Sequence, residues 1–309
     1  MTRLALQPMD SNRLAECALP MACYICGAPN TTLAEFCHCC AAPMALAHQA
    51  EGHHARPQMV AVMGASGAGK TVFLGMLMDM LSQEHTPLHL LARGAFSIGL
   101  QQTTVSALAR CEFPEKTSND PDRWNWVHCE LVDEERPRHA LPLELIMPDM
   151  AGEAVLEEVD HPHTYHVVRA LLQKSAGAMV LIDAVELLGG NHDQGYFTMK
   201  LLSYLSEIED EAGQGWSNRP IALVLTKTDQ AEQCRTDPTA FVRTHAPGMW
   251  QHCQQRFRNH RVFAASVVGC CAWRQSRGEG RRRMPLRVEP HGIVEPFQWL
   301  LGRLTPKRK

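Results

Sequence analysis

The chain has 309 residues, of which 45% are hydrophobic and 20% charged, and its formal net charge is -3. This length suffices for one large core or a core plus a small module. The nearly balanced charge gives no electrostatic drive toward nucleic acid or a membrane surface. No apolar run reaches the length of a membrane span, and the start MTRLALQPMDSNR lacks the apolar centre of a signal peptide. We therefore expect a cytoplasmic protein whose twelve cysteines bind metal or lie buried rather than form disulfides.

Four regions differ in composition along the chain. Residues 1–20 carry no periodic pattern and predict a flexible lead-in, residues 21–45 hold a cysteine cluster, and the polar residues 46–58 predict a linker. In residues 59–309, strand-like runs alternate with helical ones. This alternation predicts an α/β fold of three layers, with a mostly parallel sheet between helices.

The cysteine cluster contains two C-x-x-C pairs with ten residues between them. Each pair makes a tight turn that presents two thiolates to one metal ion, and four thiolates in tetrahedral geometry select Zn²⁺. Two disulfides are disfavoured by the compartment, and an iron–sulfur centre by the short, ribbon-like context. We predict a zinc ribbon with the ligands Cys23, Cys26, Cys37 and Cys40.

The ribbon region is also free of cationic side chains. Between Leu14 and Ala55 the sequence has no lysine or arginine. Nucleic-acid binding depends on cations that displace phosphate counterions. We therefore expect the ribbon to have a structural role or to dock a protein partner, with no nucleic-acid or membrane partner.

A phosphate loop follows the first predicted strand. MVAVMG (59–64) reads as a strand, TVFLGMLMDMLSQ (71–83) as a buried helix, and GASGAGKT between them fits G-x-x-x-x-G-K-[ST]. Such a loop aims backbone N–H groups at phosphates, the lysine neutralises β- and γ-phosphate charge, and the threonine binds Mg²⁺. The predicted nucleotide-binding residues are Gly64, Ser66, Gly67, Ala68, Gly69, Lys70 and Thr71.

A predicted hairpin leads into the next polar motif. Residues 84–120 read as an insertion containing a helix near 94–112, and strands at 124–132 and 141–149 flank a polar turn, which gives the sheet one antiparallel strand. DMAGE follows directly. Asp149 at the strand end can hold Mg²⁺ through its water shell, and Gly152 can offer its backbone N–H to the γ-phosphate.

The rest of the chain predicts three more buried strands, at 177–184, 220–229 and 261–266. The basic run RGEGRRR (277–283) is typical of a solvated loop. Helices are predicted at 154–174, 197–213, 239–257 and 292–304.

Thr226-Lys227-Thr228-Asp229 ends one of these strands. The Asp229 carboxylate can accept hydrogen bonds from the ring N–H and the exocyclic amine of guanine, whereas adenine offers no such pair of donors. A bidentate contact to a base discriminates by about 1–3 kcal/mol. The stem of Lys227 can lie over the base. The run therefore favours guanine.

In this order, GASGAGKT, DMAGE and TKTD resemble the phosphate loop, the D-x-x-G switch and the base-reading motif of Ras-like and translation-factor-type P-loop GTPases (TRAFAC class). The resemblance covers about residues 59–304 and implies binding of GTP or GDP with Mg²⁺ and control of a protein partner. Lys70 and Asp149 are 79 positions apart, a long spacing that resembles the bacterial double-GTPase group. That group implies a second GTPase or an activating protein as partner.

The resemblance also implies roles for single residues. Among the threonines ahead of the hairpin, Thr117 is the expected switch residue that reaches Mg²⁺ and the γ-phosphate. Ala265, in RVFAAS, would place its backbone near the guanine oxygen. The implied catalytic set is Lys70, Thr117, Gly152 and Glu153.

Two positions depart from the Ras-like pattern. Glu153 stands where glutamine usually orients the attacking water, and Ser66 stands where glycine leaves room for a partner's arginine. Both predict slow hydrolysis that a partner stimulates. Two alternatives remain: an ATP-using P-loop NTPase or phosphotransferase in which TKTD is accidental, and an adaptor that holds nucleotide without hydrolysing it.

Overall fold

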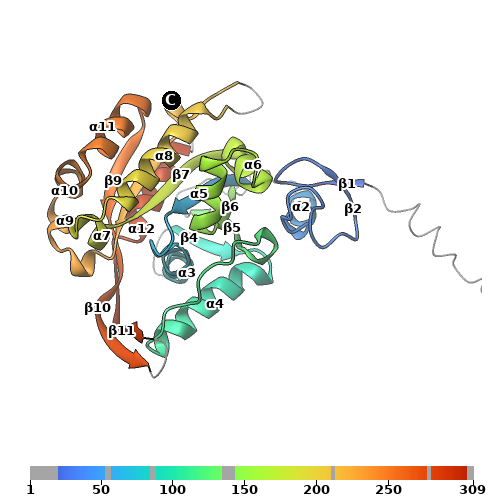
Figure 1. Cartoon of the computed structure of the whole chain (residues 1–309). Coiled ribbons are helices and arrows are strands. Elements are labelled where there is room, and N and C mark those ends of the chain that lie inside the picture. Colours follow the sequence, from blue (N-terminus) through green and yellow to red (C-terminus); the bar gives the residue numbers. More distant parts are fainter. Residues whose placement is uncertain are drawn as a thin grey trace, which may run out of the picture.

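The computed structural model describes residues 20–52, 57–83, 88–133, 143–209, 213–276 and 280–304. Its centre is a seven-stranded sheet in the order β4-β5-β6-β3-β7-β8-β9 (Figure 1). The strands are β3 (Gln58–Gly64), β4 (Leu88–Ala92), β5 (Asn125–Asp133), β6 (Leu143–Asp149), β7 (Ser175–Asp183), β8 (Ile221–Thr226) and β9 (His260–Ala264).

Only β5 runs against its neighbours. It pairs antiparallel with both β4 and β6, whereas the pairs from β6 to β9 are parallel. The predicted α/β class with one antiparallel strand is therefore confirmed. Since parallel strands end at the same edge, the carboxyl ends of β3, β6, β7 and β8 bring the polar residues that follow them together.

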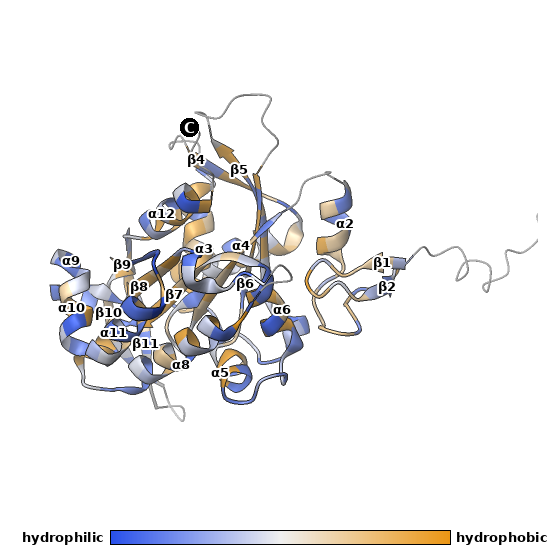
Figure 2. Ribbon diagram, turned by 90° about the horizontal axis from the view of Figure 1, so that it is seen from above, coloured by the Kyte–Doolittle hydropathy of each residue, from blue (hydrophilic) through white to orange (hydrophobic). Residues whose placement is uncertain are grey.

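Helices cover both faces of the sheet, and the sheet separates two apolar cores. The central strands of the sheet are largely apolar (Figure 2). One face is covered by α3 (Lys70–Leu81), α4 (Ala95–Ala109) and α12 (Val294–Leu304). The other is covered by α5 (Gly152–Asp160), α6 (His166–Lys174), α8 (Asp193–Glu207), α10 (Pro238–His245) and α11 (Pro247–Arg256), with the short α7 (Ala184–Leu188) and α9 (Gln233–Thr236) beside them.

Two of the predicted helices are each divided in two. The range 154–174 contains α5 and α6, which are separated at His163, a residue with a φ of 78°. The range 239–257 contains α10 and α11, and the break falls at Pro247 because proline lacks the N–H that would continue α10. The region expected as an insertion, 84–120, supplies an edge strand, β4, as well as the expected helix, α4.

A hairpin that the sequence did not predict follows β9. β10 (Ser266–Ser276) and β11 (Gly280–His291) pair antiparallel and project from the sheet (Figure 1). Of the basic run expected as a solvated loop, 277–283, residues 280–283 belong to β11, and residues 277–279 lie outside the described residues. The charged residues of this hairpin interrupt the apolar alternation by which a half-buried strand is predicted from sequence. The hairpin packs against α3 through a small cluster that includes Met76 and Val268.

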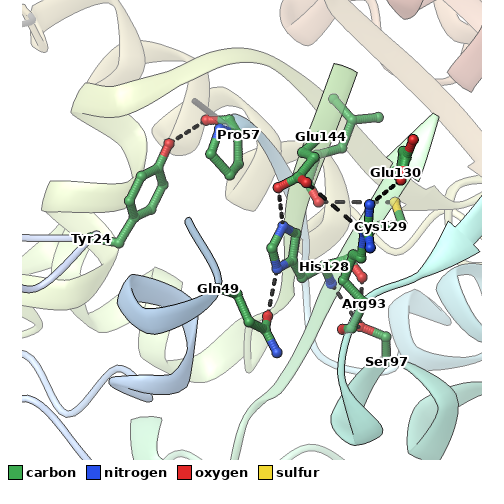
Figure 3. A network of polar contacts seen from close by, with 10 residues as sticks. Tyr24, Gln49, Pro57, Arg93, Ser97, His128, Cys129, Glu130 and Glu144 are labelled. Carbon is green, nitrogen blue, oxygen red and sulfur yellow. Dashed lines mark hydrogen bonds and ion pairs between the residues drawn. The ribbon is translucent and has the colours of Figure 1, made fainter. Parts of the chain in front are cut away.

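The N-terminal module comprises β1 (Pro20–Ala22), β2 (Pro29–Thr31) and α2 (Ala45–Gly52). α2 occupies much of the range expected as a linker, 46–58. A buried polar network joins this helix to the sheet (Figure 3). His128 on β5 contacts the Gln49 side chain of α2 at 2.6 Å and Glu144 of β6 at 2.9 Å. Because His128 and Glu144 are fully buried, these contacts fix where the module lies.

Candidate functional site

The phosphate loop has the backbone that its glycines predict. Gly69 has a φ of 89° and immediately precedes α3, so the N-terminus of that helix opens toward the loop. The Lys70 side chain is buried, and its Nζ donates to the carbonyls of Gly64 at 2.9 Å and Ala65 at 3.1 Å. Burial lowers the pKa of Lys70 to about 8, although the nearby Asp149 acts to raise it. A phosphate would restore the charge of this amine by pairing with it.

Three oxygen-bearing side chains meet beside the loop. The hydroxyls of Thr71 and Thr117 donate to Asp149 Oδ2 at 2.8 Å and 3.1 Å. The other carboxylate oxygen, Oδ1, is buried without a hydrogen-bond partner among the described residues. Burial raises the pKa of Asp149, and the bonds from Thr71 oppose that rise. Hydroxyl and carboxylate oxygens are the donors that Mg²⁺ prefers, and an unsatisfied buried oxygen calls for a cation, so these residues fit magnesium.

The D-x-x-G run touches the phosphate loop directly. A Cβ on Gly152 would lie 2.5 Å from the Ser66 backbone nitrogen, so only glycine allows this approach. Glu153 forms an ion pair with Lys116, next to the switch threonine. Partial burial acts to raise the pKa of Glu153, but the bonds from Lys116 and Ser66 outweigh it and leave the pKa below its ordinary value. The ion pair with Lys116 holds Glu153 in the cavity wall beside the phosphate loop.

The base-reading run lies at the other end of the same site. Thr226 Oγ1 donates to the Ala68 carbonyl at 2.9 Å, which fixes the phosphate loop against the end of β8. Lys227 forms an ion pair with Asp183 at the end of β7, and the Lys227 side chain lines the cavity. The Asp229 carboxylate accepts from Ser266 Oγ at 2.7 Å. A fixed carboxylate can select a base because it need not reorient to bind.

The role expected for Ala265 needs a correction. Ala265 lines the site, but its backbone N–H donates to the Leu225 carbonyl at 2.7 Å and extends the β8–β9 pairing. That N–H is therefore not free to reach a guanine oxygen. The chain continues along the site through Ser266 and Val267. Of these two residues, Ser266 donates its hydroxyl to Asp229.

These groups share one cavity of about 370 Å³. Lys70 and Asp229 both line it, and Asp149 reaches it through Thr71. Ligand sites for small molecules commonly have a few hundred Å³ or more, and this one joins a cationic phosphate end to an acidic base end. The predicted nucleotide residues that line it are Ser66, Gly67, Ala68, Gly69, Lys70, Thr71, Thr117, Gly152, Glu153, Thr226, Lys227, Asp229 and Ala265; Gly64 lies behind, as an acceptor for Lys70.

The four cysteines expected as zinc ligands also converge. Cys23 and Cys40 Sγ lie 3.7 Å apart, and Cys26 and Cys37 Sγ 3.6 Å. All four sulfurs lie within 4.8 Å of one another. Zn–S bonds of 2.3 Å in a tetrahedron place sulfurs about 3.8 Å apart, so the cluster fits zinc. Gly27, with a φ of 76°, makes the turn after the first pair.

Lys116, Ser266, Cys271 and Arg283 are among the cavity residues that the sequence did not predict. Lys116 and Ser266 could have been predicted from the sequence, since each is next to a predicted site residue. Cys271 and Arg283 come from the hairpin β10–β11 and could not be placed, because the hairpin itself was not predicted.

Comparison with known proteins agrees with this geometry. The model of the Double-GTPase 1 family matches residues 61–194, which include the phosphate loop, Thr117 and the D-x-x-G run. Among solved structures, the chain is similar to a nucleolar GTP-binding protein 1 from Plasmodium falciparum, with 11% identity and a TM-score of 0.39 over 80% of this chain and 86% of that chain. No curated protein sequence matches. Residues 61–194 of the chain are therefore similar to the Double-GTPase 1 family, and this similarity covers the phosphate loop and the D-x-x-G run.

Proposed function

We propose that this protein is a Mg²⁺-dependent GTP switch that hydrolyses GTP slowly to GDP and controls a protein partner. One observation carries the proposal: the cavity joins Lys70 at its phosphate end to Asp229 at its base end, with Asp149, Thr71 and Thr117 beside the lysine. This order of groups matches the order of phosphate, metal and base in Mg²⁺-GTP.

The site's residues have separate tasks in the proposed reaction. Lys70 and the N-terminus of α3 bind phosphate charge, and bound Mg²⁺ would neutralise charge on the β- and γ-phosphate oxygens. Asp149, Thr71 and Thr117 would hold that ion. Glu153, ionised and paired with Lys116, can accept a proton from water but cannot donate an amide hydrogen bond. Because glutamate stands at this position in place of the usual glutamine, hydrolysis without a partner should be slow.

The proposed partner is a protein, either a second GTPase or an activating protein. The zinc module offers a preformed docking element, because its cysteine site and its contact with His128 hold it in place independently of nucleotide. A cytoplasmic setting suits the proposal, since reduced thiols are needed to bind zinc. Among the described residues, no helix has both the length and the apolar character needed to cross a membrane.

A nucleotide-binding titration tests the proposal. Wild-type protein with Mg²⁺ is expected to bind GTP and GDP at least a hundredfold more tightly than ATP, and Lys70→Ala should abolish binding. Lys200→Ala is the matched control, because Lys200 is exposed and pairs with Asp160. Equal affinity for ATP would favour the alternative ATP-using enzyme, and unchanged affinity in Lys70→Ala would refute both.

Single-turnover hydrolysis then separates a switch from an adaptor. A slow conversion of bound GTP, accelerated by a partner protein, is expected for the switch. No turnover with any candidate partner would favour a protein that holds nucleotide without hydrolysing it.

A further inference from the structure

We propose that Arg283, on the hairpin β10–β11, reads the guanine base by donating hydrogen bonds to its O6 and N7 atoms while Asp229 binds the opposite, donor-bearing edge. This inference rests on the proposed GTP binding and adds to it a second specificity residue, from an element that lies outside the three motifs.

The hairpin forms part of the cavity wall. Val267, Val268 and Cys271 of β10 and Arg283 of β11 line the cavity together with Asp229. Trp273 pairs with Arg283 across the two strands. Because side chains alternate along a strand, Cys271, two residues from Trp273, shares its face with Arg283. The two cavity-lining side chains therefore project from one face of the hairpin.

Arg283 also lies near the base-reading carboxylate. Burial raises the pKa of the Cys271 thiol, Asp229 raises it further, and Arg283 acts to lower it. Both charges therefore act on the Cys271 thiol, and Asp229, Cys271 and Arg283 all line the cavity. Because Arg283 and Asp229 share this neighbour, we infer that the guanidinium lies at the base end of the cavity.

The guanidinium has an unused donor there. Arg283 Nη2 is buried, and no described residue accepts a hydrogen bond from it. A buried N–H without an acceptor is costly, so the cavity favours an occupant that supplies one. Of the lysines that line the cavity, Lys116 and Lys227 pair with Glu153 and Asp183, and Lys70 lies in the phosphate loop. Arg283 Nη2 is therefore a donor that the base can use.

Guanine offers the matching acceptors. Its O6 and N7 lie side by side and fit the planar fork of arginine, whereas adenine carries a donor in place of O6. Asp229 binds N1–H and the exocyclic amine, and O6 is bonded to the carbon next to N1. The backbone N–H of Ala265, which was expected near the guanine oxygen, does not donate to O6, because it donates to the Leu225 carbonyl. Asp229 and Arg283 would together reject adenine from two edges.

The experiment compares nucleotide affinities by titration with GTP, with 7-deaza-GTP, which lacks N7, and with 6-thio-GTP, in which sulfur, a weaker acceptor, replaces O6 while N1–H and the exocyclic amine remain. Wild-type protein is expected to bind each analogue about tenfold more weakly than GTP. Arg283→Ala should lose affinity for GTP by a similar factor and bind GTP and 7-deaza-GTP equally. Arg287→Ala is the matched control, since Arg287 is an exposed arginine on the same strand and pairs with Glu289.

Three results would overturn the inference: wild-type affinity unaffected by removal of N7 and by replacement of O6 with sulfur, Arg283→Ala with unchanged GTP affinity, or Arg283→Ala with the same penalty for 7-deaza-GTP as wild type. Arg283→Lys keeps the charge but not the planar fork. If the alanine variant does not fold, the lysine variant replaces it in the test and is expected to show the same loss of affinity for GTP. Wild-type protein that binds no guanine nucleotide would instead refute the proposed function itself.

Discussion

The hydroxyl oxygens of Thr71 and Thr117 lie 3.0 Å apart, although 46 positions separate them in the chain. Both also donate to one oxygen of Asp149. Thr71 lies in the first turn of α3 and Thr117 lies in the loop after α4, so the contact joins the loop after α4 to the rest of the site. A metal ion that recruits both hydroxyls would couple the position of this loop to the bound nucleotide.

Asp149→Asn should therefore weaken Mg²⁺-dependent GTP binding, because an amide has no charge to offset the metal's. We expect a loss of about 10–100-fold with Mg²⁺ and a much smaller loss in EDTA. Titration under both conditions measures the difference. Thr117→Ala should show a weaker effect of the same kind, and Thr244→Ala, which alters an exposed helical threonine, should show none. An equal loss in EDTA would argue against a metal role.

The ion pair between Lys116 and Glu153 predicts a second effect. Glu153→Gln supplies an amide donor to the attacking water and frees Lys116 to approach the γ-phosphate. We expect single-turnover GTP hydrolysis to rise about tenfold while GTP affinity stays unchanged. Glu157→Gln, exposed on the same helix, is the control. A rate that falls or stays constant in Glu153→Gln would contradict this account of slow hydrolysis.

Sequence alone predicted the elements whose signals are local. The phosphate loop, DMAGE and TKTD each end a buried strand, and the common edge of a parallel sheet brings such ends together. Thr117 was placed from its polar surroundings and from the resemblance, and the structure puts its hydroxyl 3.1 Å from Asp149. These predictions needed only the order of strands along the chain and the rule that ligands bind at their carboxyl ends.

The hairpin β10–β11 escaped prediction because its pattern is not apolar. Arg281, Arg282 and Arg283 stand within β11, where a strand buried on one face would show alternation. β11 is stabilised by pairing with β10, and β10 in turn contacts α3, so its stability depends on tertiary structure. Ala265 shows a similar limit. Its N–H bonds the Leu225 carbonyl of the neighbouring strand, and composition does not determine which N–H groups are paired in this way.

Asp229→Asn is predicted to change the base that is bound. The amide donates where the carboxylate accepted, so the variant should prefer xanthosine triphosphate, whose ring carries an oxygen in place of the exocyclic amine. We expect GTP affinity to fall at least tenfold and xanthosine triphosphate affinity to rise. Competition binding measures both. Asp160→Asn, which removes an exposed carboxylate, should leave the preference unchanged. Loss of GTP binding without any gain would indicate a merely structural carboxylate.

The cysteine cluster predicts one bound zinc ion per chain. Cys26→Ser should release it, because serine is a poor ligand for zinc, and should destabilise the N-terminal module. Metal analysis of purified protein and thermal unfolding with a chelator give the two readouts. Cys39→Ser is a close control, since Cys39 is exposed and outside the group of four sulfurs. Equal zinc content in the two variants would exclude the proposed ligand set.

Lys70 gives the pH prediction. Burial holds the pKa of Lys70 at about 8, below its ordinary value of 10.5. Between these values the unfolded chain binds more protons than the folded chain, so the stability of nucleotide-free protein rises with pH. Relative to Lys70→Met, which cannot titrate, wild type should gain about 3 kcal/mol as the pH rises from 7 to above 10.

Urea unfolding at several pH values measures this difference, because comparing the two proteins cancels the titration of groups that they share. Mg²⁺-GTP should abolish the gain, since phosphate charge raises the pKa of Lys70 and keeps the amine protonated. Lys200→Met, at an exposed position, should follow the wild-type curve. The free energies of unfolding of Lys70→Met and wild type would change in parallel from pH 7 to 10 if burial did not destabilise the charged amine. In that case the protein itself would already compensate the charge of Lys70, and a phosphate would not be needed to do so.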